Sequence, residues 1–355
     1  MSVGPPEQGA TSHLERELRE QPLALERLIA TQRESAERIA GLLRRDDVDY
    51  VLIASRGSSS NAARYAQYVL GRAHRVPVAF ATPSLYTLYG QPPRLTGALV
   101  VGISQSGRSP DVKEVLEEAK RQGRPTVAIT NDVASPLAAV ADEVLALEAG
   151  EELAVAATKT YLNSLGAIAL LFAVATSDSE ALHELERIPA HVALQIERSW
   201  DDAQRLDRLG ELHGGTVVAR GVNYATAYET ALKIRELSGM LFEAYSAADL
   251  MHGPIAAVGA GWPVVAIAPR GPAFESMASA LGAFKERGAR LVVVSDDDRA
   301  LAKADAALPL WTRVPEWLSP LVAVIPGQLA ALRFAQLRGI DLDTPLGLHK
   351  VTLTR

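Results

Sequence analysis

The stretch Ile103-Ser-Gln-Ser-Gly-Arg-Ser-Pro-Asp111 joins a predicted strand to a predicted helix. The apolar run before it, Ala98–Gly102, has the continuous hydrophobicity of a strand buried on both faces of a parallel sheet. The segment after it, residues 112–119, has the apolar spacing of an amphipathic helix. A strand-to-helix connection of this kind predicts an α/β protein built on a parallel sheet.

The side chains of this stretch also favour an anion site. Ser104, Ser106 and Ser109 supply hydroxyls and Gln105 supplies an amide. Ser109 followed by Pro110 is typical of a helix N-cap and the first helical residue. Hydroxyls beside the free N–H groups of a helix start suit a phosphate. Geometry alone leaves an ordinary polar turn as the alternative.

Strands and helices alternate along the first half of the chain. The predicted strands are residues 50–55, 98–103, 126–130 and 143–147, and the predicted helices are 62–70, 112–119 and about 158–174. Upstream, residues 13–45 have helical spacing, and Pro22 predicts a break there. This alternation predicts a doubly wound parallel sheet.

The second half of the chain repeats the first at an offset of about 165 positions, which is too long for a solenoid. The matching pairs are 52–57 with 216–221, 100–107 with 264–271, and 120–130 with 285–295. We therefore predict two homologous doubly wound α/β domains in tandem. The expected segments are a disordered lead-in and N-terminal helices (1–45), a first domain (46–176), a helical linker (177–208), a second domain (209–340) and a C-terminal tail (341–355). The second domain lacks the hydroxyl-rich turn, so we expect the first domain to bind the ligand.

Composition narrows the function. The chain of 355 residues has a net charge of −6 and no cysteine. The negative charge argues against a nucleic-acid partner. The lack of cysteine excludes disulfides, thiolate nucleophiles and the usual structural zinc sites. The N-terminus has no signal-peptide pattern, and the apolar run Leu165–Thr176 is too short to span a membrane. We expect a cytoplasmic protein with no metal and no cofactor.

Paired domains carrying Gly57-Ser-Ser59 and Ile103–Gly107 resemble the sugar isomerase (SIS) family. Within that family the chain is similar to the isomerase half of glucosamine-6-phosphate synthase and to the related stand-alone glucosamine-6-phosphate deaminases. Further matching motifs are Glu20-Gln-Pro22, Glu152–Lys159, Ala231–Glu236, Glu243–Pro254 and Leu348–Thr352. The resemblance covers almost the whole chain.

The resemblance implies roles for four residues. Glu236 matches the base that moves a proton between C1 and C2, and Lys233 is its neighbour one turn earlier. His252 matches the residue that opens the sugar ring, which relatives supply from the partner subunit of a homodimer. Lys350 matches a tail lysine that forms a Schiff base with fructose 6-phosphate in the synthase. The implied sugar-phosphate site contains Gly57, Ser58, Ser59, Ser104, Gln105, Ser106, Ser109, Val155 and Ala157.

The chemistry of these side chains fits such roles. Lys233 and Glu236 are three apart on a predicted helix, so they share one face, although an exposed ion pair has the same spacing. A carboxylate suits proton abstraction beside a carbonyl or imine. An imidazole such as His252 shuttles protons near neutral pH. A structural or exposed loop histidine is the alternative, and the match to the family motif favours catalysis. Lys350 is either a solvated tail charge or, once docked, an amine that attacks a carbonyl.

Departures from the synthase pattern direct the functional prediction. Ala157 stands where the synthase has a serine, and Arg108 where it has an acidic residue. We also expect no glutaminase domain. We therefore predict isomerising deamination of glucosamine 6-phosphate to fructose 6-phosphate and ammonia. The alternatives are a glutamine-independent synthase-like isomerase or aminotransferase, a fructosamine-6-phosphate deglycase, a plain aldose–ketose isomerase and a non-catalytic sugar-phosphate sensor.

Overall fold

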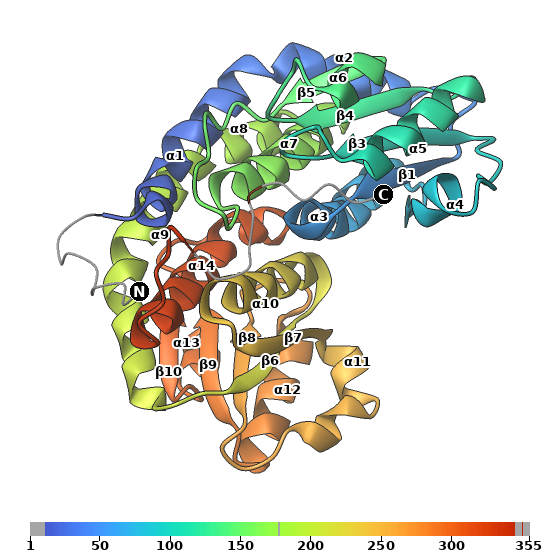
Figure 1. The fold of residues 1–355 in the computed structure, drawn as a ribbon. Helices are drawn as coiled ribbons and strands as arrows, with labels where there is room; N and C mark the ends of the chain where they lie inside the picture. Colours follow the sequence, from blue (N-terminus) through green and yellow to red (C-terminus); the bar gives the residue numbers. More distant parts are fainter. Residues whose placement is uncertain (1–10, 177, 345–349, 351–355) are drawn as a thin grey trace, which may run out of the picture.

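The computed structural model describes residues 11–176, 178–344 and 350, which form two parallel five-stranded sheets (Figure 1). The first sheet has the order β2-β1-β3-β4-β5 and the second the order β10-β9-β8-β6-β7. The strands are β1 (Tyr50–Ser55), β2 (Val78–Phe80), β3 (Ala98–Ile103), β4 (Thr126–Thr130), β5 (Glu143–Ala146), β6 (Gly214–Ala219), β7 (Leu241–Ser246), β8 (Pro263–Ile267), β9 (Arg290–Ser295) and β10 (Ala306–Pro309). The prediction of two doubly wound parallel-sheet domains in tandem is confirmed.

Helices cover both faces of each sheet. Those that precede or belong to the first domain are α1 (His13–Thr31), α2 (Arg33–Leu43), α3 (Gly57–His74), α4 (Ser84–Thr87), α5 (Pro110–Arg121), α6 (Pro136–Val140) and α7 (Lys159–Ala175). The region expected as a helical linker contains α8 (Ser179–Glu186), α9 (Ile188–Asp202) and the 3-10 turn η1 (Ala203–Leu209). The second domain has η2 (Gly221–Asn223), α10 (Tyr224–Ser238), α11 (Ala247–Met251), η3 (Pro254–Ala257), α12 (Phe274–Glu286), α13 (Asp298–Leu301), η4 (Glu316–Leu318) and α14 (Ser319–Leu337).

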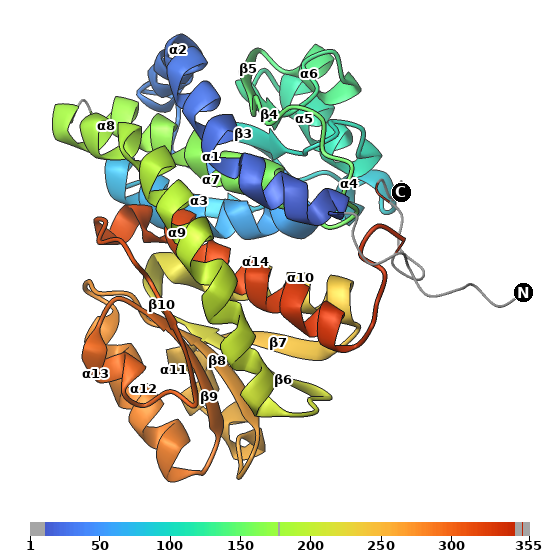
Figure 2. The ribbon, with the colours of Figure 1, turned by 90° about the vertical axis from the view of Figure 1, so that its left-hand side faces the viewer.

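One hydrophobic core joins the two domains. It runs from Val51 and Ile53 in the first sheet, through helices α3, α7, α10 and α14, to Val217 and Val265 in the second sheet. Figures 1 and 2 show these helices stacked between the sheets, with α1 and α9 packed along one side. Separate clusters cover the outer faces, under α5 in the first domain and under α12 in the second. The domains are therefore held in a fixed relative position by buried apolar surface.

The expected break at Pro22 is wrong, because α1 continues through it. A proline inside a helix leaves the carbonyl four residues earlier without its backbone donor, here Leu18. The side-chain amide of Gln21 donates to that carbonyl at 3.2 Å and so replaces the missing bond. The helix begins at a capping box, in which Ser12 and Glu15 bond to each other's backbone N–H groups.

One helical stretch, Glu316–Leu337, is long and apolar enough to cross a membrane. Of its most apolar window, however, 94% is buried inside the protein, where α14 packs against α10 and α9. Its apolar character is therefore accounted for by burial in the core shared by the two domains.

The contact between α10 and α14 depends on a glycine. A Cβ placed on Gly327 would lie 2.2 Å from Thr230 Oγ1, so the two helices approach too closely for any side chain there. Gly282 in α12 has the opposite environment, because the nearest atom to its added Cβ is Lys303 Nζ at 3.5 Å.

We predict that Gly327→Ala lowers the free energy of unfolding by about 1–3 kcal/mol through overpacking. The matched control Gly282→Ala should raise it by roughly 0.5–1 kcal/mol through helix propensity alone. Urea denaturation measures both effects. Equal stabilisation by the two substitutions would contradict the close approach of α10 and α14.

Candidate active site

The candidate site lies at the carboxyl end of β1, where the strand order of the first sheet reverses. Its neighbours are β2 on one side and β3 on the other, so the loops after β1 and β3 meet at the carboxyl edge of the sheet. Gly57 and Gly107 turn these loops with positive φ angles of 53° and 60°. A Cβ on Gly107 would lie 2.0 Å from Ser135 Oγ, so only glycine fits there.

The loop after β3 brings two hydroxyls together. Ser109 occupies the N-cap position of α5, as predicted, but its side chain makes no capping bond. Its Oγ lies 3.4 Å from Oγ of the buried Ser104. Ser106 turns back to its own loop, where its Oγ accepts the N–H of Arg108 at 3.3 Å, and Gln105 is half-buried beside it. The convergence predicted from sequence therefore holds most closely for Ser104 and Ser109.

The loop after β1 is bonded to the second domain. Oγ of Ser58 donates to Glu229 Oε1 at 2.9 Å, and Nδ2 of Asn61 donates to Glu229 Oε2 at 2.8 Å. Glu229 lies on α10 and is fully buried. Ser59, between the two donors, is half-buried. The first loop and α10 consequently form one structural unit.

Lys233 and Glu236 lie on α10, on the same helix face as Glu229. The ammonium of Lys233 forms ion pairs with Glu229, at 3.5 Å, and with Glu236. Lys233 is 1% exposed and Glu236 is 27% exposed, so this is not the exposed surface pair that the spacing also allowed. Burial by itself lowers the pKa of Lys233, but the charges of Glu229 and Glu236 outweigh burial and raise the pKa above its ordinary value.

For Glu229, burial outweighs the effect of the neighbouring groups on the pKa. Burial raises the pKa of its carboxyl group above the ordinary value, although Lys233 and Asn61 act to lower it. A lone carboxylate at this depth would be costly, and its hydrogen bonds and ion pair offset that cost. A row of three charges therefore runs along α10, formed by Glu229, Lys233 and Glu236. It begins at the loop after β1 and ends at the partly exposed carboxylate of Glu236.

The loop before α7 is organised by a second buried carboxylate, Glu152. It accepts the N–H groups of Thr158 and Thr160, at 3.0 and 3.1 Å, and the hydroxyl of Thr160 at 2.7 Å. A negative charge at a helix start is favourable, because free N–H groups and the helix dipole both face it. Val155 and Ala157 are half-buried on the loop that this carboxylate shapes.

Lys350 docks onto this same loop. Its Nζ donates to Glu152 Oε2 at 2.9 Å and to the carbonyl of Ala154 at 2.6 Å. The negative charge of Glu152 also helps to raise the pKa of Lys233. The rest of the predicted tail motif lies outside the described residues.

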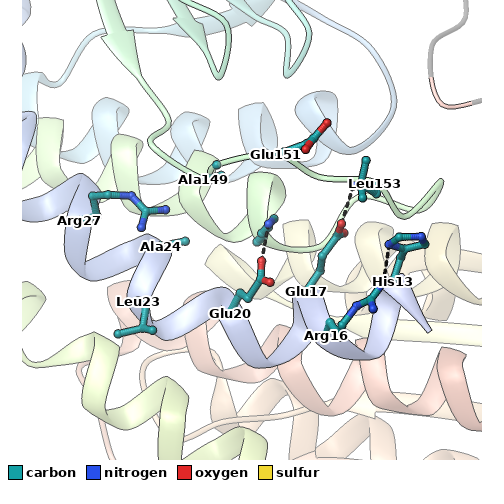
Figure 3. Close-up of a pocket in the computed structure, with 12 residues that line it drawn as sticks. His13, Arg16, Glu17, Glu20, Leu23, Ala24, Arg27, Ala149, Glu151 and Leu153 are labelled. Carbon is teal, nitrogen blue, oxygen red and sulfur yellow. Dashed lines mark hydrogen bonds and ion pairs between the residues drawn. The ribbon is translucent and has the colours of Figure 1, made fainter. Parts of the chain in front are cut away.

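Helix α1 braces the loop from the other side, beside a cavity of about 450 Å³ (Figure 3). Glu17 and Glu20 point from α1 toward the loop that runs from Ala149 to Leu153. Glu17 accepts the N–H groups of Leu153 and Ala154, and Glu20 pairs with the buried Lys159. Burial raises the pKa of Glu17. The Glu20-Gln-Pro22 motif thus has a scaffolding role.

His252 lies apart from these groups. It follows α11, is exposed, and donates its backbone N–H to Asp249 at 3.2 Å. Its ring forms no hydrogen bond or ion pair with any residue in the described ranges. Within the described part of one chain, His252 therefore forms no hydrogen bond or ion pair with Glu236.

Several residues of the site are absent from the sequence prediction. Glu229 was detectable from its spacing of four residues before Lys233, but many surface pairs share that spacing. Asn61 and Glu17 act through contacts across the fold, which no local pattern reveals. In the described part of the chain, no group of three or more His, Asp or Glu side chains could hold a metal ion.

Comparison with known proteins agrees with the geometry. A model of the SIS domain matches residues 47–174 and again residues 216–338. The chain belongs to the SIS family. This SIS protein is 34% identical over 97% of its length to a glutamine–fructose-6-phosphate aminotransferase [isomerizing] of Pyrococcus horikoshii, and 32% identical to that of Thermus thermophilus. The matches span 58% and 59% of those longer relatives.

Solved structures give the same result. A putative phosphosugar isomerase from Silicibacter pomeroyi superposes with a TM-score of 0.83 at 32% identity, over 93% of this SIS protein and 99% of that chain. The C-terminal domain of glucosamine-fructose-6-phosphate aminotransferase from Francisella tularensis gives 0.83 at 26% identity, over 96% and 100%. The predicted resemblance is confirmed.

We predict that Lys233→Met destabilises the SIS protein by about 3–5 kcal/mol, because it leaves Glu229 as an unpaired buried charge. The double variant Glu229→Gln/Lys233→Met should recover a large part of this loss. Lys113→Met is the control, since Lys113 forms an ordinary helix-surface pair with Glu117 and should cost at most about 0.5 kcal/mol. Guanidinium denaturation compares them. Equal losses at Lys113 and Lys233 would contradict the buried ion-pair row.

Proposed function

We propose that this protein catalyses the isomerising deamination of glucosamine 6-phosphate to fructose 6-phosphate and ammonia. The observation that carries this proposal is the row of buried charges from the loop after β1 to Glu236. It sets a carboxylate, fixed by Lys233, near a hydroxyl-lined helix start that suits a phosphate. The relatives at 32–34% identity are named as isomerising aminotransferases that act with fructose 6-phosphate.

In the first step the phosphate binds at the carboxyl edge of the first sheet. The hydroxyls of Ser59, Ser104 and Ser109 donate to its oxygens, together with the free N–H groups at the starts of α3 and α5. His252 of a second copy then moves a proton between the ring oxygen and the anomeric hydroxyl, which opens the ring. We accordingly propose a cytoplasmic homodimer that needs no cofactor.

The carboxylate of Glu236 removes the proton from C2 of the open-chain aldehyde and returns it to C1. The oxygen on C1 takes up the proton that the amine gives up, so the C1 carbonyl becomes an alcohol and the amine at C2 becomes an imine. Water adds to this imine and releases ammonia, which leaves the ketone of fructose 6-phosphate. Once Lys350 leaves Glu152 and loses a proton, its amine can first displace ammonia from C2, and water then hydrolyses that second imine.

We predict that the purified protein releases ammonia from glucosamine 6-phosphate. Glu236→Gln should reduce kcat by about two to four orders of magnitude, because the proton at C2 loses its acceptor, while sugar-phosphate binding persists. A coupled ammonia assay and calorimetry measure the two quantities. Glu275→Gln, at an exposed pair with Arg299, is the control and should stay fully active.

Two results would count against this assignment. Normal turnover by Glu236→Gln would show that another group is the base. Tight binding of glucosamine 6-phosphate by the wild-type protein, with no ammonia released, would show that deamination is not its reaction. In that case, interconversion of fructose 6-phosphate and glucose 6-phosphate would identify a plain aldose–ketose isomerase.

We also predict that two inactive variants restore each other when mixed. His252→Asn and Glu236→Gln each disable both sites of a homodimer, but a mixed dimer keeps one intact site if His252 crosses the interface. Random exchange of equal amounts should recover about a quarter of wild-type activity, since half the dimers are mixed and each has one working site. No recovery, with exchange verified by native mass spectrometry, would place His252 in its own chain's site.

A further inference from the structure

A second cavity, of about 720 Å³, lies at the corresponding edge of the second sheet. It lies beside the loops after β6 and β8, where the strand order of the second sheet reverses. Parallel α/β sheets bind ligands at such points. The wall from the first domain is α3, just as α10 forms a wall of the candidate active site. The polar side chains that line the cavity include Arg72, Arg220, Ser246, Asp249, Ser276 and Glu316.

The backbone of the first site is repeated at this edge. Arg56 has φ −138° and ψ 157°, and Arg220 has φ −145° and ψ 157°. Each is followed by a glycine with positive φ, 53° at Gly57 and 61° at Gly221. The loops are therefore the same device in two copies, and the side chains on them can be compared position by position.

The charges are not repeated. Counting fifteen residues from each glycine leads to Arg72 in the first half and Glu236 in the second, so a guanidinium takes the place of the carboxylate base. In the first copy the guanidinium of Arg56 is paired with buried Asp111 at 2.6 Å. At the place of Asp111 the second copy has Glu275, which pairs with Arg299 instead.

This divergence leaves two cations facing the cavity. Within residues 11–176, 178–344 and 350, neither Arg72 nor Arg220 forms a side-chain hydrogen bond or an ion pair. Guanidinium groups are strong donors with a geometry that matches phosphate and carboxylate. A cavity lined by two guanidinium groups whose donors are not engaged in this way is suited to an anion.

A carboxylate occupies the position next to the glycines. A Cβ on Gly271 would lie 2.7 Å from Cγ of Glu316, and one on Gly221 would lie 3.5 Å from its Oε1. Burial raises the pKa of Glu316, although the charge of Arg72 acts to lower it. Asp249 and the hydroxyls of Ser246 and Ser276 also line the cavity. The carboxylate of Glu316 thus lies beside the loop glycines, and the guanidinium of Arg72 lies at the position that Glu236 has in the first site, while Arg220 lies on the loop itself.

We propose that this cavity is a second, non-catalytic site for a small phosphorylated sugar. Arg72 and Arg220 hold the phosphate, while Glu316 and Asp249 accept hydrogen bonds from the sugar hydroxyls. A guanidinium stays protonated near neutral pH, so the group at the position of Glu236 cannot take a proton from the ligand here. The proposal stands on the cavity and its charges and does not rest on the proposed activity of the first site.

The test is titration calorimetry of the full chain with fructose 6-phosphate as the probe. The wild-type protein should bind two equivalents per chain. The variant Arg72→Gln/Arg220→Gln should lose one equivalent, or bind it at least about tenfold more weakly, because both phosphate partners are removed. Ser104→Ala/Ser109→Ala should lose the other. The matched control is Arg270→Gln, which lies on the loop after β8 at the same edge of the sheet but pairs with Asp297 at 3.4 Å.

The outcomes separate the two sites. The second site is overturned if Arg72→Gln/Arg220→Gln binds as many equivalents of fructose 6-phosphate as Arg270→Gln does, with similar affinity. If one equivalent binds, is lost on arginine substitution and survives serine substitution, the second site stands and the first has failed. Inorganic phosphate is the second probe and should bind at least about tenfold more weakly than fructose 6-phosphate, since it makes no hydroxyl contacts. Equal affinity overturns recognition of the sugar.

Discussion

The arrangement of the site depends on one interaction, the burial of Glu229 between the two domains. Its carboxylate accepts bonds from Ser58 and Asn61 in α3 and is paired with Lys233 in α10. A buried charge persists only when its partners are fixed, so this contact allows very little freedom between the helices. The position of Glu236 relative to the loops of the first sheet follows from that constraint. A proton-transfer centre assembled from two domains needs such a constraint, because misplacement by about an ångström is costly to the rate.

The two halves of the chain show how one backbone supports different chemistry. The strand order, the loop after the first strand and the glycine that turns it are retained in both domains. The hydroxyls of Ser104 and Ser109 become Ala268 and Ala273, and the sign of charge on the facing helix is reversed. Backbone geometry decides where a ligand can bind, while the side chains decide what is bound there and whether it reacts.

Sequence patterns predicted the regular elements well where the elements are buried. Strands β1, β3 and β4 are continuous apolar runs, and the internal repeat located their copies. The edge strand β2 was missed because it has three residues and is only half-buried, so it leaves almost no pattern. The break predicted at Pro22 was wrong because a side-chain hydrogen bond from Gln21 replaces the missing backbone bond. Hydrophobic periodicity does not reveal such a bond.

The site was predicted through short motifs, and its supporting contacts were not. Lys233 and Glu236 were found because they share a helix face, but their burial depends on Glu229 and α3. Glu152 was noted only as the first residue of a motif, although it shapes the loop before α7 and accepts a hydrogen bond from Lys350. These contacts join residues far apart in sequence, and local spacing contains no information about them.

Gln21 has a consequence for how the polypeptide folds as it is synthesised. Besides replacing the bond lost at Pro22, its amide donates to Gln328 at 3.0 Å, across a sequence separation of 307 residues. Helix α1 therefore reaches its final contacts only after α14 has left the ribosome. Until then the amide of Gln21 lacks one of its two acceptors, and the core shared by the two domains is incomplete. Closure of the core shared by the two domains therefore depends on the synthesis of α14.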